Sequence, residues 1–360
     1  MVRCSASSQV ATIYTSDGCV TKYFVYISGE NIGLAKGEVN ALSRLFRIKD
    51  PVMWDGRMAL IESHTNPVSF FLNRAALVKE AGVVLSEVAA QDDLYEGLSD
   101  DLLINAIGKK GTFSIRTISE REGFPVEQRL ELETTLGARI KHVVGARVNL
   151  ENPQTRILVF FTQNSVRICK SITSTLRPLL RAREPGQKAF FHPSMMNATL
   201  SRVMCNLARV VPNEIVLDPF CGGGGILSEA SLIGARTVGV DLNWQLLTGS
   251  EKNLSLISSD YSIIQGDIRS LPIEWCDCIV TDPPYGRASS TRGAQSIGLV
   301  ESLFKRADSV LRRRDESICI CGSSEMNLKD LADSMGLVIG QVLQVRVHRG
   351  LVREILTLGI

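Results

Sequence analysis

The 360-residue sequence lacks the features that mark a membrane or exported protein. Its apolar runs all stop short of the ~18 residues that a membrane span needs. The N-terminus does not show the basic, apolar and small-residue order of an export signal. We therefore expect a cytoplasmic protein with no membrane partner.

The sequence also lacks the spacing of a zinc site. It has nine cysteines and four histidines, but no Cys-x-x-Cys pair and no histidine close to a cysteine pair. Cys276/Cys278 and Cys319/Cys321 lie in strand-like runs, where residues i and i+2 share a face. Free cysteine is a common buried apolar residue. We expect no bound metal and, in a reducing compartment, no disulfide.

An excess of one charge is also missing, since the formal net charge is only +2. The distribution of charge is more informative, because one window around the middle of the chain is basic. Its cations are Arg167, Lys170, Arg177, Arg181, Arg183 and Lys188, with Glu184 as the single opposing acid among them. The window indicates a basic linker able to meet phosphates. A solvated connector between domains explains the charge equally well.

The most specific pattern present is Asp-Pro-Pro-Tyr-Gly at 282–286. It follows the apolar run 277–281, which is typical of a buried strand, so it lies where open α/β sheets bind ligands. The two prolines remove backbone donors and leave carbonyl acceptors. Asp282 adds a carboxylate, and Tyr285 offers a flat face for a base. The motif predicts methylation of an exocyclic amine on a nucleic-acid base.

A glycine-rich turn supports this interpretation. The strand predicted at 214–218 leads into Asp-Pro-Phe-Cys-Gly-Gly-Gly-Gly at 218–225 and then a helix at 226–234. Such a turn lets a ligand approach the backbone closely. Strands predicted at 237–241 and 261–265 lead to further acids. Four acids, Asp218, Asp241, Asp267 and Asp282, thus follow four successive strands. Any one alone is equally typical of a helix cap or turn.

Two other enzyme classes use glycine-rich turns. A dinucleotide-binding dehydrogenase does not need an acid before the turn or a Pro-Pro-Tyr after the fourth strand. A phosphate-binding NTPase loop requires Gly-Lys-Ser/Thr, which does not follow these glycines. Both fit the pattern less well.

Together the turn and the acids resemble the class I S-adenosylmethionine-dependent methyltransferases. The resemblance implies that Gly222 and Gly224 face the methionine part of the cofactor, that Asp241 holds the ribose, and that Asp267 contacts the adenine amine. The full implied cofactor set is His192, Pro193, Asp218, Pro219, Phe220, Cys221, Gly222, Gly224, Asp241, Leu242, Asp267, Ile268 and Asp282. His192 is equally consistent with a capping or packing residue. The implied catalytic set is Asp282, Pro283, Pro284 and Tyr285.

The first half of the chain resembles a ferredoxin-like unit followed by a THUMP RNA-binding domain. The resemblance rests on Ser-Gly-Glu-Asn at 28–31, Phe-Ser-Ile-Arg at 113–116, and Val-Asn-Leu-Glu-Asn-Pro at 148–153. We expect RNA contacts at Arg116, Lys170, Arg177, Arg181, Arg183, Lys188 and Arg287. The expected domains are a ferredoxin-like unit (1–60), THUMP (61–170), a basic linker (171–190) and a methyltransferase domain (191–360). No internal repeat is visible.

The expected fold class is α/β, with a Rossmann-like methyltransferase domain of seven strands. We predict its last strands at 317–321, 341–347 and 354–358, with one reversed edge strand. In the first half we predict strands at 22–28, 111–118, 154–161 and 165–172, and helices at 34–45, 66–82 and 129–136.

The upstream THUMP pattern with Asp-Pro-Pro-Tyr-Gly-Arg most resembles the archaeal-type tRNA (guanine N2) methyltransferases that act at position 10. A related group acts at position 6. The alternatives are an adenine N6 methyltransferase and an RNA-binding protein with an inactive methyltransferase fold. The sequence leaves open the target nucleotide, mono- or dimethylation, the oligomeric state, the role of residues 1–20, and the need for an accessory protein.

Overall fold

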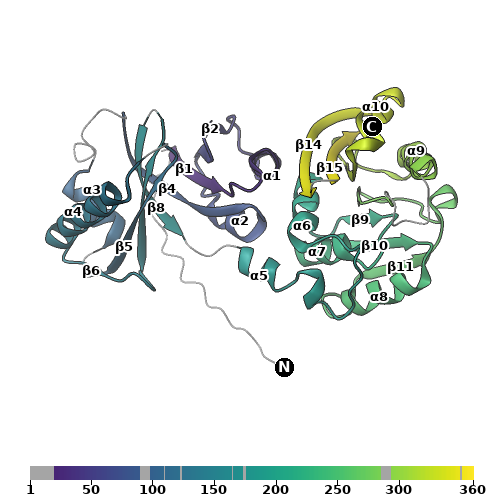
Figure 1. The fold of residues 1–360 in the computed structure, drawn as a ribbon, viewed down its shortest axis with the longest axis horizontal. Coiled ribbons are helices and arrows are strands. Elements are labelled where there is room, and N and C mark those ends of the chain that lie inside the picture. The colour runs from purple at the N-terminus through teal and green to yellow at the C-terminus, as the bar shows by residue number, and fades with distance from the viewer. Residues whose placement is uncertain are drawn as a thin grey trace.

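The computed structural model describes residues 20–89, 98–108, 110–121, 124–163, 165–172, 176–284, 293–348 and 351–360. The described residues form two sheets (Figure 1). The first has eight strands in the order β2-β3-β1-β4-β8-β7-β5-β6, and the second has seven in the order β11-β10-β9-β12-β13-β15-β14.

The first half of the chain builds the eight-stranded sheet and its helices. In chain order its elements are β1 (Thr21–Ile27), α1 (Ile32–Leu45), β2 (Met53–Asp55), β3 (Met58–Ser63), α2 (Val68–Arg74), β4 (Val78–Ala89), α3 (Asp100–Ile107), β5 (Thr112–Ser119), α4 (Val126–Val144), β6 (Arg147–Val148), β7 (Thr155–Phe161) and β8 (Ser165–Ile172). Helix α1 begins where the Asn31 side chain accepts a hydrogen bond from Leu34 N, and α4 ends at Gly145, whose φ is +69°.

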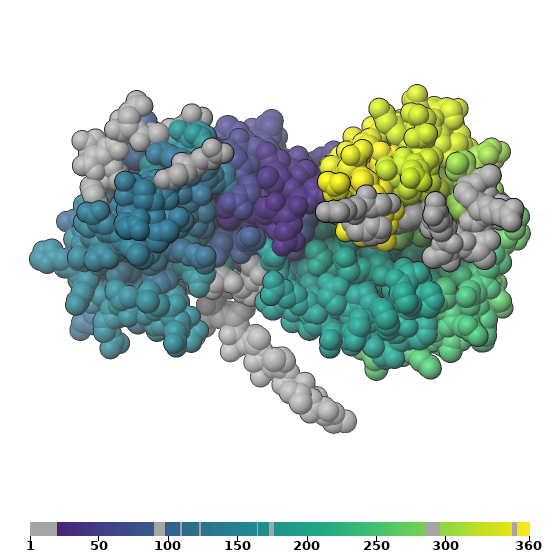
Figure 2. All heavy atoms as spheres, in the orientation of Figure 1, coloured from purple at the N-terminus to yellow at the C-terminus, as the bar shows by residue number. Residues whose placement is uncertain are grey.

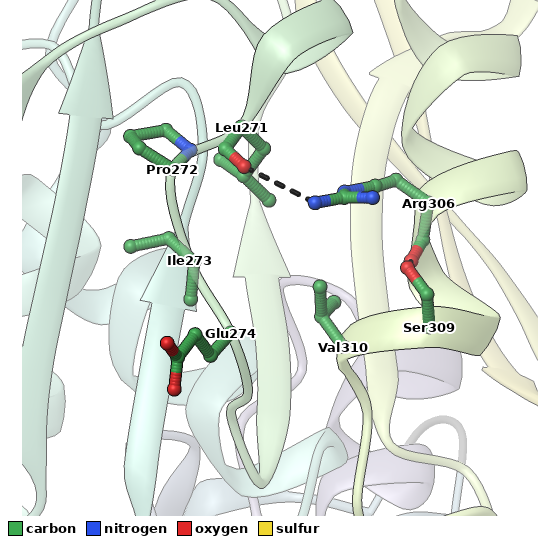
Figure 3. A pocket seen from close by; sticks show the side chains of 7 residues that line it. All are labelled: Leu271, Pro272, Ile273, Glu274, Arg306, Ser309 and Val310. Atoms are coloured by element: carbon green, nitrogen blue, oxygen red, sulfur yellow. Dashed lines mark hydrogen bonds between the residues drawn. The ribbon is translucent and has the colours of Figure 1, made fainter.

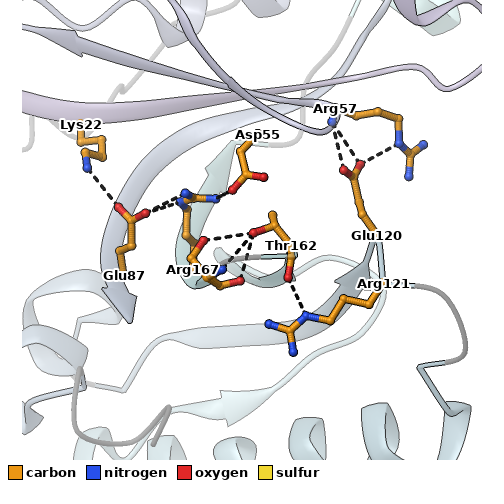
Figure 4. Close-up of polar contacts among 9 residues, drawn as sticks. Lys22, Asp55, Arg57, Glu87, Glu120, Arg121, Thr162 and Arg167 are labelled. Atoms are coloured by element: carbon orange, nitrogen blue, oxygen red, sulfur yellow. Dashed lines mark hydrogen bonds and ion pairs between the residues drawn. The ribbon is translucent and has the colours of Figure 1, made fainter. Parts of the chain in front are cut away.

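The eight-stranded sheet is strongly curled. Arg57 precedes β3 and Glu120 follows β5, and five strand spacings would separate them by roughly 24 Å in a flat sheet. Nevertheless Arg57 Nε lies 2.8 Å from Glu120 Oε1, as Figure 4 shows. The helices all pack on the convex face. Tyr23 packs with α1 and α2 and Ile157 packs with α3 and α4, and the strand register places these two residues on the same face of the sheet.

The concave face holds a small aromatic cluster that includes Phe24, Tyr26 and Phe160. Beside it, Arg167 is almost fully buried and pairs with both Asp55 and Glu87. Figure 4 shows this network, which borders a hollow of about 540 Å³. Strand β3 crosses residue 60, so one sheet runs through both expected N-terminal units. The division into two units at that residue stays a prediction.

The second half forms the seven-stranded sheet. A connector holds α5 (Arg177–Arg181) and η1 (Pro185–Gln187). The domain then contains α6 (Ala198–Leu207), β9 (Ile215–Asp218), α7 (Gly225–Ile233), β10 (Arg236–Asp241), α8 (Trp244–Leu254), β11 (Tyr261–Gln265), η2 (Ile268–Ser270), β12 (Cys278–Thr281), α9 (Gly293–Val310), β13 (Ile318–Ser323), η3 (Ser324–Met326), α10 (Leu328–Ser334), β14 (Val338–His348) and β15 (Leu351–Gly359). Apolar clusters attach α6 and α7 to one face and α9 and α10 to the other.

Two details of the sequence prediction are wrong. The helix predicted over 66–82 is α2 followed by strand β4, since Val78, Val83 and Val84 favour a strand that pairs with β1 and β8. The reversed strand is β15, which lies inside the sheet between β13 and the edge strand β14. The seven-stranded sheet itself is confirmed.

The two halves share one hydrophobic core. The same cluster contains Val39 of α1, Phe71 of α2 and Val203 of α6. Figure 2 shows the purple segment at the start of the described chain in contact with the yellow C-terminal strands. At this junction Asn31 Nδ2 donates to Gln344 O at 2.8 Å, and Arg44 pairs with Glu316. The N-terminal half and the sheet that bears the acids are therefore packed together.

Candidate active site

The glycine turn after β9 is packed on one side and open on the other. Gly222 and Gly224 have φ values of +50° and +77°, which side chains rarely adopt. A Cβ on Gly223 would lie 2.6 Å from Met195 Sδ, and one on Gly224 would lie 2.4 Å from Ser250 Oγ. A Cβ on Gly222 would meet no atom of the described residues within 4 Å. The open side at Gly222 can therefore admit a ligand close to the backbone.

Asp241 supports this turn from the neighbouring strand. Its Oδ2 accepts a hydrogen bond from Gly222 N at 2.9 Å, and its Oδ1 accepts one from Asn243 N at 2.8 Å. Each carboxylate oxygen keeps a further lone pair. Asp241 thus shapes the turn and can also accept from a hydroxyl, so its ribose assignment stays a prediction. Leu242 beside it is exposed.

Asp218 links the glycine turn to the strand that precedes the Asp-Pro-Pro motif. It is buried, and its Oδ1 accepts hydrogen bonds from Thr281 Oγ1 at 2.6 Å and Phe220 N at 3.2 Å. Burial raises the pKa of Asp218 to about 7, and the negative charges of Asp282 and Asp241 add to the effect. Three of the four predicted acids therefore interact electrostatically at one edge of the sheet.

Asp267 has a partner that the sequence reasoning missed. Its Oδ1 accepts hydrogen bonds from both N and Nε of Arg269 at 2.9 Å, and these bonds lower the pKa of Asp267. The Arg269 side chain is 67% exposed, so it can move away. A contact from Asp267 to an adenine amine requires the carboxylate to be shared with Arg269 or released by it. The sequence signal that could have revealed this partner is the arginine two residues after Asp267. Ile268 between them is buried.

The segment before α6 is fixed to the glycine turn by Asn253. This amide accepts from Phe190 N at 3.0 Å and donates to Phe190 O at 3.1 Å and Gly223 O at 3.0 Å. Sequence reasoning missed Asn253, because nothing local distinguishes it from an ordinary helical residue. His192 and Pro193 are exposed, and His192 Nδ1 is hydrogen-bonded to Ser194 Oγ at 2.6 Å.

Asp282 follows β12 at the same edge, with Pro283 buried and Pro284 half-buried. The guanidinium of Arg353 lies near its carboxylate, with 3.8 Å between Nη2 and Oδ2. Sequence reasoning did not single out Arg353, which is 71 positions away along the chain (353 − 282). Tyr285 and Arg287 lie outside the described residues.

The predicted RNA-binding cations divide into two groups. Arg116 and Arg181 are exposed, and Arg177 is half-buried at 3.9 Å from Glu30. Lys170 and Lys188 are partly buried, and burial lowers the pKa of each.

Lys170 Nζ donates to Ala106 O at 2.7 Å. Arg183 makes a two-point contact with Glu229, a fully buried acid on α7, at 2.8 and 3.1 Å. Arg202 pairs with the same acid. Arg183 therefore attaches the connector to the catalytic domain, which the sequence did not reveal.

Cys278, Cys319 and Cys321 lie in strands of the sheet and Cys276 lies just before β12, and all four are buried. Within the described part of the chain, no three His, Cys, Asp or Glu side chains gather in a geometry that could hold a metal ion. No helix in that part is long and apolar enough to cross a membrane. A hollow of about 310 Å³ beside α9 is lined by Leu271, Pro272, Ile273, Glu274, Arg306, Ser309 and Val310 (Figure 3), none of which is a predicted site residue.

Comparison with known proteins identifies both halves. Residues 185–355 match the family described as RMKL-like, methyltransferase domain, and residues 89–169 match the THUMP domain. The tRNA (guanine(10)-N2)-dimethyltransferase of Pyrococcus abyssi is 30% identical over 341 residues, covering 92% of this chain and 97% of the relative. The enzyme of the same name from Methanothermobacter thermautotrophicus is 36% identical over 226 residues, covering 62% of this chain and 67% of the relative.

The chain belongs to the tRNA (guanine(10)-N2)-dimethyltransferase family. This membership confirms the resemblance drawn from the sequence. The crystal structure of TrmN from Thermus thermophilus has the same fold, with a TM-score of 0.55 at 19% identity, covering 94% of this chain and 99% of that one. The family fold therefore extends over both sheets.

Proposed function

We propose that this enzyme methylates the N2 amine of guanosine 10 in tRNA, with S-adenosylmethionine as the methyl donor. Family membership supports the reaction and the substrate. The observation that carries the assignment of the site is the Thr281–Asp218 hydrogen bond, which joins the start of the Asp-Pro-Pro motif to the glycine turn. The residues proposed to bind the cofactor and those proposed to bind the base therefore lie next to each other.

The residues present fit the cofactor. Any side chain at position 222 would occupy the open space in front of the glycine turn. An acid ends or follows each of the strands β9, β10, β11 and β12 beside this space. Asp218 and Asp241 would hold the cationic and hydroxyl-bearing parts of the donor, while the exposed Leu242 would offer apolar surface to its base. S-adenosylmethionine supplies an electrophilic methyl group on a sulfonium centre when it is bound.

The protein's own task is to make a poor nucleophile reactive. The lone pair of the guanine amine is delocalised into the ring. We infer that the Asp282 carboxylate and the Pro283 carbonyl accept hydrogen bonds from its two protons, which favours a pyramidal nitrogen. Because Pro283 and Pro284 have no N–H groups, the motif presents acceptors only at this point. Asp282 also stabilises the positive charge that develops on nitrogen.

Tyr285 would hold the base by stacking, an interaction worth ~1–3 kcal/mol per base. The base has to leave its helical stack to reach the site. Arg116, Arg181, Arg177 and Arg287 are the cations that we propose for phosphate contacts. The proposed activity requires the chain to meet tRNA; the cytoplasmic location stays a prediction, which cell fractionation would test.

The purified chain, an unmodified tRNA transcript and S-adenosylmethionine test this proposal directly. We expect N2-methylguanosine and then N2,N2-dimethylguanosine, because a monomethylated amine still has one proton and a lone pair. Nucleoside mass spectrometry and a guanosine-10-to-adenosine transcript identify the product and its position. Methylation at position 6, methylation of adenine, or activity only after addition of a cell extract would each contradict part of the proposal.

A further inference from the structure

Arg353 reaches the active-site edge from a strand that runs against the others. Strand β15 is antiparallel to β13, and its register places Arg353 opposite Ser323, the last residue of β13. The amino-terminal end of β15 therefore lies at the edge where the parallel strands finish. Strand β13 separates β15 from β12, so the long arginine side chain spans one strand to reach Asp282.

The contact between Arg353 and Asp282 is largely shielded from water. Nη2 lies 3.8 Å from Oδ2, and the two side chains are 17% and 15% exposed. The following residues of β15, from Ile355 to Leu358, are buried in the cores on both faces of the sheet. A cation at the start of such a strand is costly to bury unless it has a partner.

One further acid faces the Asp282 carboxylate, and a second acid interacts with the first. Asp218 at the end of β9 interacts with Asp282, and Asp241 at the end of β10 interacts with Asp218. Within the part of the chain that the structure describes, Arg353 is the cation that an ion pair places beside Asp282. Repulsion from Asp218 favours the neutral form of Asp282 or a rotation away from it, and the guanidinium opposes both.

We propose that Arg353 is a positioning residue for methyl transfer, which orients the Asp282 carboxylate toward the amine and keeps it ionised. This inference rests on the proposed function, because it assigns Asp282 the recognition of the guanine amine. Arg353 acts through Asp282. It therefore controls the rate of transfer more than the binding of tRNA or of S-adenosylmethionine.

The test compares full-length Arg353→Met and Arg353→Lys with Arg236→Met. Arg236 is the first residue of β10, so it lies at the end of the parallel strands opposite to the active site, and it forms an exposed ion pair with Asp260. We expect Arg353→Met to lower kcat about 10- to 100-fold, the range found when a residue that orients a metal-ligating side chain is lost. KM for tRNA and the calorimetric Kd of S-adenosylmethionine should change less than about threefold. Arg353→Lys should recover most of kcat, and Arg236→Met should behave as wild type.

The pH profile separates positioning from a structural role. Without the cation, the acid limb of the kcat profile should move to higher pH, because Asp282 loses the charge that favours its ionised form. A crystal structure of Arg353→Met should show the Asp282 side chain rotated. An unmoved profile with wild-type kcat overturns the inference, as does a rise in KM for tRNA alone. If wild-type protein forms no methylguanosine in this assay, the proposed function itself fails.

Discussion

The charge on Asp218 depends on pH within the physiological range, because burial raises its pKa from 3.8 to about 7. The carboxyl is mostly protonated at pH 6 and mostly ionised at pH 8. A ligand with sulfonium and ammonium groups favours the ionised form. We expect the Kd of S-adenosylmethionine to fall about 3- to 10-fold from pH 6 to pH 8, since tenfold corresponds to one pKa unit. Calorimetry at both values measures this change.

Asp218→Asn is the control for that experiment, because the amide keeps an acceptor for Thr281 but cannot ionise. Its Kd should be nearly independent of pH, and a flat profile for the wild type would contradict the assignment.

The ionisation of Asp218 also affects the stability of the protein. The folded carboxyl binds its proton more tightly than the unfolded one, so the free energy of unfolding of the ligand-free protein should decrease as pH rises from about 4 to about 7.

Asp282 is the residue on which the proposed chemistry depends. Asp282→Ala removes an acceptor for the amine and the charge that stabilises the transition state, so we expect kcat to fall at least about 100-fold. Calorimetric binding of S-adenosylmethionine should be retained, because the glycine turn is held by Asp241 and Asn253. Turnover near the wild-type rate would remove Asp282 from the mechanism.

At the scale of elements, the connector is held by a buried ion cluster. Glu229 of α7 is fully buried and binds Arg183 of the connector and Arg202 of α6. Glu229→Ala would leave two guanidinium groups without their acid, and breaking such a buried pair costs about 3–5 kcal/mol. Chemical denaturation measures the change in the free energy of unfolding.

Glu301→Ala is a matched control for Glu229→Ala, because Glu301 pairs with Lys305 on the exposed surface of α9. Exposed pairs of this spacing contribute only about 0.3–0.5 kcal/mol. Equal losses for the two variants would show that the buried cluster has no special role in holding the connector.

At the scale of the whole molecule, the shared core makes the two halves one cooperative unit. Asn206 of α6 lies at the junction and is fully buried. Its Nδ2 donates to Glu38 Oε1 at 2.7 Å, and its Oδ1 accepts from Arg74 Nε at 2.6 Å. Glu38 also accepts from the backbone of Ala76 and Leu77. The amide thus joins an acid and a base of the first half to the catalytic half.

We expect the full chain to unfold in one calorimetric transition and Asn206→Leu to unfold at lower temperature. The leucine removes one hydrogen-bond partner each from Glu38 Oε1 and Arg74 Nε, and a buried polar group left unsatisfied costs about 1–3 kcal/mol. Asn40→Leu, at an exposed position of α1, the helix that carries Glu38, should change the transition little. An unaltered transition in Asn206→Leu would mean that the junction does not couple the halves.

The sequence alone determined that four acids follow four successive strands, because strand period, glycine turns and the Asp-Pro-Pro motif are local signals, and the resemblance that these motifs carry implied the seven-stranded fold. Asp218 followed a predicted strand, and the structure places it beside Thr281 as the topology requires.

Only the tertiary structure decided which charges are paired. The sequence analysis placed Arg183 among the RNA contacts and did not single out Arg269 or Arg353, yet each of the three has an acid as a close partner. The prediction of a helix over 66–82 was wrong for a related reason, because residues from 78 onward form β4, which pairs with a strand distant in sequence. Ion pairs and strand pairs between remote residues depend on distances in space, and no periodicity along the chain records them.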